Sequence, residues 1–151
     1  MQQIKHFTNA QDKIFASVVV DSQHHMLSCL WRSEALAAGQ IDDVTEYCAQ
    51  SIQTLKLHYW LNDVTCIQSP FHAHSAEAQK SALDRLHDTP LKKFALVSQR
   101  EANPSRSALI HALKQCGVEI RTFKNLVLAS EWLLLPSLED EAWDKCDALA
   151  Y

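Results

Sequence analysis

The stretch LHYWLND, residues 57–63, decides the fold that this sequence predicts. It is an apolar, aromatic run that ends in two short polar residues, which is typical of a buried strand. The spacing of apolar residues predicts an amphipathic helix before it, over residues 41–55, and another after it, over residues 75–87. This order of helix, buried strand and helix is repeated downstream, and it predicts an α/β protein built on a sheet.

The other predicted elements complete this architecture. We expect an N-terminal β-hairpin that leads into a mixed, mostly parallel sheet of about five strands, covered by about four helices. Asp42 and Asp43 are expected in the first turn of the helix over 41–55, where they favour its dipole. The predicted strands are residues 15–20, 26–31, 57–61, 94–97 and 118–123, and the later helices begin at Asn103-Pro104 and Asn125. Gly117 is the predicted C′ residue that ends the third helix.

Composition and charge narrow the function classes. The 151 residues carry a net charge of −4 and no strongly basic face, which argues against nucleic acid or an anionic membrane as the partner. The two glycines, Gly39 and Gly117, cannot form a phosphate-binding loop, so we expect no nucleotide and no other cofactor. The five cysteines form no CxxC pair, and we interpret them as buried thiols. No signal peptide or membrane-spanning run is recognisable, and a cytoplasmic protein is expected.

The sequence predicts one domain over residues 1–136 and a helical tail over residues 137–151. Within the tail, one apolar stripe is formed by residues at helical spacing, Leu138, Ala142, Cys146 and Leu149, with Trp143 beside it. A stripe of this kind packs either on its own domain or on another subunit, so a homodimer is one of two open possibilities.

Several segments together resemble a known family. They are the hairpin ending in Leu30-Trp31, the helix carrying Tyr47, the strand over 59–63 and the closing stretch over 117–133. Over roughly residues 14–135 the chain resembles the STAS-like, or SpoIIAA-like, superfamily of anti-sigma-factor antagonists and related bacterial domains. The resemblance implies a small signalling or binding module, not an enzyme, with a protein or small molecule as its partner.

The phosphorylated serine of the antagonists has no counterpart here. The resemblance implies an Asp-Ser-Ser-Gly turn after the central strand, but residues 63–70 read DVTCIQSP. The nearest hydroxyl groups, on Ser69 and Ser75, lie in no matching motif. A serine phosphoswitch of the antagonist type is therefore not expected.

Polar residues follow three of the predicted parallel strands. Ligands of open α/β sheets bind at the carboxyl ends of the strands, and the candidate ligand or phosphoacceptor residues there are Asn62, Asp63, Ser98, Arg100 and Lys124. The order of Asp, Ser and Lys is also similar to that of receiver domains, with Asp21 as the upstream acid. The structural alternative is that Asn and Asp only form turns or caps at strand ends. We favour a non-catalytic binding module, and a receiver-like phosphoacceptor or small enzyme is the alternative.

Three further clusters have a functional and a structural interpretation. Metal ligands are available from His72, His74 and Cys66, with His24 and His25 recruited from the hairpin, but no four-ligand spacing is present. Cys66 paired with His72 or His74 is a possible nucleophile, although a buried packing thiol is favoured and no metal is expected. Trp60, Trp132, Trp143 and Phe94 either line a cavity or, as we favour, fill the core between sheet and helices.

Overall fold

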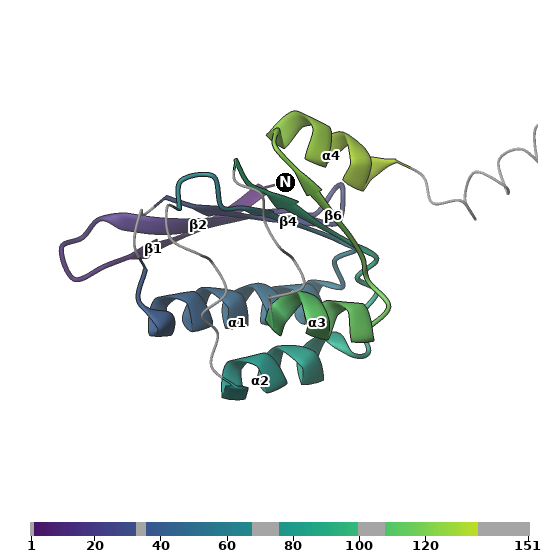
Figure 1. The fold of residues 1–151 in the computed structure, drawn as a ribbon, viewed down its shortest axis with the longest axis horizontal. Coiled ribbons are helices and arrows are strands. Elements are labelled where there is room, and N and C mark those ends of the chain that lie inside the picture. Colours follow the sequence, from purple (N-terminus) through teal and green to yellow (C-terminus); the bar gives the residue numbers. More distant parts are fainter. Residues whose placement is uncertain (1, 33–35, 68–75, 100–107, 136–151) are drawn as a thin grey trace, which may run out of the picture.

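The chain forms one mixed β-sheet with helices on both of its faces (Figure 1). The structure is a computed structural model, and it describes residues 2–32, 36–67, 76–99 and 108–135. Within these residues the strands are β1 (Gln2–Thr8), β2 (Ile14–Asp21), β3 (Met26–Trp31), β4 (Tyr59–Asp63), β5 (Lys93–Val97) and β6 (Glu119–Phe123). The helices are α1 (Ala38–Leu55), α2 (Ala76–Leu86), α3 (Ala108–Gln115) and α4 (Leu126–Leu134).

The strands lie in the sheet in the same order as in the chain. β1, β2 and β3 run antiparallel, whereas β3, β4, β5 and β6 run parallel to one another. A parallel step needs a crossover connection, and α1, α2 and α3 occupy the three crossovers. The predicted α/β class, in which a hairpin leads into a mixed, mostly parallel sheet covered by four helices, is confirmed.

The predicted count of about five strands was one too low, because β1 was missed. Its sequence, QQIKHFT, has Ile4 and Phe7 as its only apolar residues, so it shows no alternation of the kind that predicts a strand. β1 lies at the edge of the sheet and most of its side chains are exposed. The pairing with β2 supplies the backbone hydrogen bonds that the sequence pattern does not reveal.

Two cores lie on opposite faces of the sheet. On the face of α1, α2 and α3, the rings of Trp60 and Phe94 meet edge to face with centroids 5.2 Å apart. On the face of α4, a smaller core consists of Leu61, Ala95, Val97, Ala129, Trp132 and Leu133. β4 and β5 are therefore covered on both sides, which explains their nearly continuous apolar sequences.

Several predicted boundaries are shifted, and two of the shifts change the interpretation. α1 begins at Ala38, so Asp42 and Asp43 lie beyond the first turn and do not act on its terminus as expected. β4 begins at Tyr59, two residues later than predicted, because the backbone N–H groups of His58 and Tyr59 both donate to the carbonyl oxygen of His25. The β2–β3 turn thus fixes where pairing with β4 starts.

The predicted helix ends after β5 and β6 are confirmed. Gly117 adopts a φ of 79°, and Val118 N donates to Leu113 O at 3.1 Å, as a C′ glycine requires. Asn125 caps α4, since its Oδ1 accepts hydrogen bonds from the N–H groups of Val127 and Leu128. The predicted caps Ser75 and Asn103-Pro104, and the tail over 137–151, lie outside the described residues.

Candidate functional site

Asn62 and Asp63 are the last two residues of β4, and their side chains point to opposite faces of the sheet. Asn62 is 4% exposed, and its Oδ1 accepts a hydrogen bond of 2.7 Å from Trp31 Nε1. Trp31 belongs to the core on the face of α1, α2 and α3. Asp63 Oδ1 accepts from Thr65 N at 3.0 Å and from Thr65 Oγ1 at 2.8 Å. Asp63 thus forms a turn at the strand end, as the structural alternative predicts, whereas Asn62 makes a buried hydrogen bond to β3 that this alternative does not describe.

Ser98 and Lys124 follow β5 and β6, at the same end of the sheet as Asp63. Ser98 N donates to Phe123 O at 2.9 Å, and Gln99 Nε2 donates to Lys124 O at 3.0 Å. The Lys124 side chain is exposed. Arg100 lies outside the described residues. The parallel strands therefore bring the backbone of Asp63, Ser98 and Lys124 to the same end of the sheet, as predicted.

The upstream acid of the receiver alternative is misplaced. Asp21 pairs with Met26, which pairs with Tyr59 at the amino end of β4, whereas Asp63 is at its carboxyl end. Because β2 runs antiparallel to the later strands, its last residue lies at the opposite end of the sheet from their last residues. Asp21 and Asp63 therefore cannot hold one magnesium ion together.

The same separation rules out the metal site that combined the hairpin histidines with Cys66. His25 lies at the amino end of β4, while Cys66 follows the carboxyl end. No group of three His, Cys, Asp or Glu side chains in the part of the chain that the structure describes is placed to hold a metal. His72 and His74 lie outside it. The prediction that Cys66 is a buried packing residue was wrong, because its side chain is exposed.

The histidines of the β2–β3 turn make local contacts of their own. The rings of His25 and His58 stack with centroids 4.7 Å apart and planes 20° apart. Burial, His25 and Lys92 together lower the pKa of His58, because each disfavours a further positive charge. In the same turn, the hydrogen bond of 2.7 Å with His24 lowers the pKa of Asp21. The stack joins the hairpin to the start of β4.

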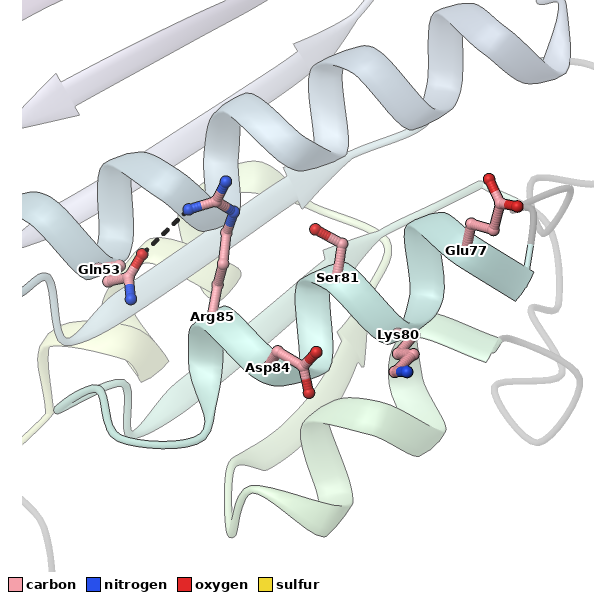
Figure 2. Close-up of a pocket in the computed structure, with 6 residues that line it drawn as sticks. All are labelled: Gln53, Glu77, Lys80, Ser81, Asp84 and Arg85. Carbon is pink, nitrogen blue, oxygen red and sulfur yellow. Dashed lines mark hydrogen bonds between the residues drawn. The ribbon is translucent and has the colours of Figure 1, made fainter.

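An open hollow of about 480 Å³ lies between α1 and α2 (Figure 2). Its lining is polar and carries equal numbers of acidic and basic side chains: Gln53, Glu77, Lys80, Ser81, Asp84 and Arg85. Arg85 pairs with Glu46 and also donates from Nη1 to Gln53 Oε1 at 3.2 Å, while Ser81 Oγ donates to Glu46 Oε2 at 2.9 Å. These bonds tie the two helices together and leave no excess charge to select a ligand.

Most of the exposed large apolar side chains among the described residues lie at α4, on the second face of the sheet. α4 packs on β4, β5 and β6, and the sheet beyond it is not covered by a described helix (Figure 1). Five of the eight exposed large apolar side chains belong to α4 or to the residue after it: Leu126, Val127, Leu128, Leu134 and Leu135. We call these five residues the α4 patch.

Trp132 and Lys93 hold α4 in place under this patch. Lys93 is 7% exposed, and its Nζ donates to the carbonyl oxygens of Trp132 and Leu135, each at 3.0 Å. The same ammonium lies 5.1 Å from the centre of the Trp132 ring, and the Arg121 guanidinium lies 5.5 Å from it. A buried cation thus satisfies the last carbonyl groups of the helix and favours its dipole.

The sequence prediction did not identify the α4 patch, although a signal was present. The helix sequence LVLASEWLL has apolar residues on all sides, and a helix of that kind is normally covered on all sides. Trp60, Phe94 and Trp132 do not line one cavity, which was the alternative; Trp60 and Phe94 fill the core on one face of the sheet and Trp132 the core on the other, as favoured. Trp143 lies outside the described residues.

The chain matches no protein-family model and no curated protein. Among solved structures it is similar to an uncharacterized protein of the DUF3478 family with a SpoIIAA-like fold from Shewanella loihica PV-4. The two chains are 17% identical, the match covers 88% of this chain and 95% of that chain, and the TM-score is 0.39. At this identity and TM-score the likeness supports no conclusion about fold or function.

None of the helices in the described ranges is both long enough and apolar enough to cross a bilayer.

Proposed function

We propose that this chain is a non-catalytic, STAS-like interaction module that binds a protein partner through the α4 patch. The observation that carries the proposal is the exposure of the patch, which runs from 42% at Leu134 to 63% at Val127. Val127 and Leu134 are seven residues apart and lie on the same side of the helix, opposite Ala129 and Leu133. Apolar surface gathered on one element is typical of a contact with another protein.

The polar candidates support the same proposal. Asn62 and Asp63 are engaged in hydrogen bonds within the fold, and the α1–α2 hollow has no excess of either charge. Small-molecule sites normally combine an enclosed apolar pocket with a few converging polar groups, and this hollow is open and polar. A protein partner is therefore favoured over a small ligand. The free thiols of Cys29, Cys48, Cys66 and Cys116 support a reducing compartment such as the cytoplasm.

The proposal is tested by site-specific photo-crosslinking in cells that make the protein. A photoreactive amino acid replaces Val127 in the α4 patch, and in a second strain it replaces Gln50, which is exposed on α1. We expect a discrete protein adduct at position 127, identified by mass spectrometry, and none at position 50. A Leu134→Asp substitution should remove that adduct without unfolding the chain, because the side chain is already exposed. Adducts at both positions, or at neither, would contradict the proposal.

The receiver-like alternative has its own test. The chain is treated with a small-molecule phosphodonor in Mg²⁺, and its intact mass is measured. The binding module predicts no added phosphate, because Asp63 has no second acid such as Asp21 beside it. An added phosphate that is lost in Asp63→Asn would instead establish phosphoacceptor chemistry at the strand ends.

A further inference from the structure

The α4 patch lies where the described chain ends. Leu135, its last member, is the C-cap of α4 and has an extended backbone with φ −66° and ψ 140°. Lys93 Nζ holds the Leu135 carbonyl oxygen at 3.0 Å, so the direction in which the chain leaves the helix is fixed. Pro136 follows, and a proline disfavours the helical conformation for the residue before it. The chain is thus turned off the axis of α4 directly beside the patch.

The segment that continues from this point is residues 137–151, which we call the C-terminal segment. It contains Leu138, Ala142, Cys146 and Leu149 at helical spacing. Fifteen residues of helix measure about 22 Å and the nine residues of α4 about 13 Å, so the segment is long enough to run the full length of the patch. A connection this short gives an effective concentration of about a millimolar or more, which favours a contact within the chain.

Charge is complementary as well. The C-terminal segment carries five acidic residues and one lysine, and so accounts for the whole net charge of −4. Its lysine, Lys145, lies between Ala142 and Leu149 in the spacing of the apolar stripe, while α4 carries a single acid, Glu131, between Val127 and Leu134. The basic side chains of Arg121 and Lys124 are exposed next to α4 and can face the acidic side of the segment.

We propose that the C-terminal segment docks as an amphipathic helix on the α4 patch of its own chain, and that a partner binds by displacing it. The first half of the proposal rests on the exposed patch, the exit of the chain beside it, and the length and pattern of the segment. The second half rests on the proposed function. The segment is then a built-in competitor that keeps the apolar surface covered until a partner of higher affinity is present.

The test is hydroxyl-radical footprinting of the full chain, read by mass spectrometry on the α4 patch. In Leu138→Asp/Leu149→Asp the apolar stripe is broken, and labelling of the patch should rise about three-fold over the native chain, because those side chains then meet water. The matched control, Asp140→Glu/Asp144→Glu, changes residues off the stripe, keeps the acidic charge of the segment, and should label like the native chain. Unchanged labelling of residues 26–31 in β3 verifies that each variant is folded.

Light scattering of the same samples identifies the occupant. If the chain's own segment covers the α4 patch, the protein is a monomer and the protection of the patch from labelling does not change on dilution. Protection that disappears on dilution, together with the mass of a dimer, would assign the patch to a second copy and overturn the proposal. Native labelling as strong as in Leu138→Asp/Leu149→Asp would show an uncovered patch and overturn it too.

The photo-crosslinking at position 127 separates this proposal from the proposed function. If the segment competes with a partner, the adduct yield should rise about three-fold in Leu138→Asp/Leu149→Asp, in parallel with the footprint. Adduct yield that is unchanged by the substitutions would refute the competition while leaving the binding function in place. A protected patch without any adduct in either chain would refute the binding function and leave the docked segment as a part of the fold.

Discussion

The two faces of the sheet are covered very differently, although they are the two sides of the same strands. On one face, α1, α2 and α3 cover the strands (Figure 1), and buried apolar side chains pack between the helices and the sheet. On the other face, α4 covers β4, β5 and β6, while Ile4 on β1 remains 58% exposed. Among the described residues the first face is complete, and the second leaves apolar surface that a further contact must cover.

The covering helices themselves show the same contrast. α1 buries Val44, Cys48 and Ile52 and turns the polar residues Asp43 and Gln50 to the solvent. α4 buries Ala129, Trp132 and Leu133, yet its outer side is apolar apart from Glu131. A helix whose outer side faces water normally carries polar residues on that side, as α1 does. The outer side of α4 is therefore suited to a protein contact, and substitutions on the two faces should differ in their effect.

The largest expected effect is a loss of stability from a substitution in the core on the face of α1, α2 and α3. Phe94→Ala removes a ring that is 1% exposed and packs against Trp60, and it should lower the free energy of unfolding by about 3–5 kcal/mol. Val127→Ala is the matched control on the other face and should change it by about 0.5 kcal/mol or less. Urea denaturation measures both. If Phe94→Ala does not fold, Phe94→Leu gives a smaller loss of the same sign. Equal effects of Phe94→Ala and Val127→Ala would contradict the comparison.

The next effect concerns the attachment of α4. Lys93→Met keeps the length of the side chain but removes the Nζ donor to the carbonyl oxygens of Trp132 and Leu135, of which that of Trp132 also accepts from Leu135 N, at 3.3 Å. Loss of a donor to buried acceptors costs about 1–3 kcal/mol, and hydrogen exchange in α4 should accelerate more than in α1. Lys92→Met, at the exposed neighbouring position, is the control. Exchange that rises equally in α1 and α4 would mean that Lys93 supports the whole sheet and not α4.

Most of the fold was predictable because its signals are local. The strands around Trp60 and Phe94 are apolar on both faces, and Gly117 and Asn125 mark helix ends by residue type alone. β1 could not be predicted, because an exposed edge strand needs no apolar alternation. The start of β4 could not be predicted either, since it depends on hydrogen bonds to His25, which is distant in the sequence.

The candidate site was less predictable than the fold. Sequence reasoning brought Asp63, Ser98 and Lys124 to one end of the sheet, because parallel strands share their carboxyl ends. It did not place Asp21 correctly, since the direction of β2 follows from its pairing and not from its composition. The exposure of Val127 and its neighbours was also missed, because an apolar helix sequence does not state which side stays uncovered.

A smaller effect is expected at the start of α4. Asn125→Ala removes the oxygen that accepts hydrogen bonds from Val127 N and Leu128 N, at 2.7 and 3.3 Å. Loss of such a cap costs about 1 kcal/mol, which urea denaturation detects, and it should loosen the half of the α4 patch nearest β6. Asn125→Asp retains a capping oxygen and should stay close to the native value. A destabilised Asn125→Asp would indicate that the amide, and not the cap, is what matters.

The smallest expected effect concerns the ring stack between the β2–β3 turn and the start of β4. His25 belongs to the β2–β3 turn and His58 precedes β4, so their stack links the two halves. The pKa of His58 is lowered in the folded chain by burial, His25 and Lys92, so between that value and the ordinary value of about 6.5 the unfolded chain binds more protons. The free energy of unfolding should therefore decline slightly as the pH falls below 6.5, in urea titrations at stepped pH. His58→Gln should remove this part of the decline, whereas His87→Gln, at an exposed position, should retain it. Identical slopes in the native chain and His58→Gln would mean that folding does not lower the pKa of His58.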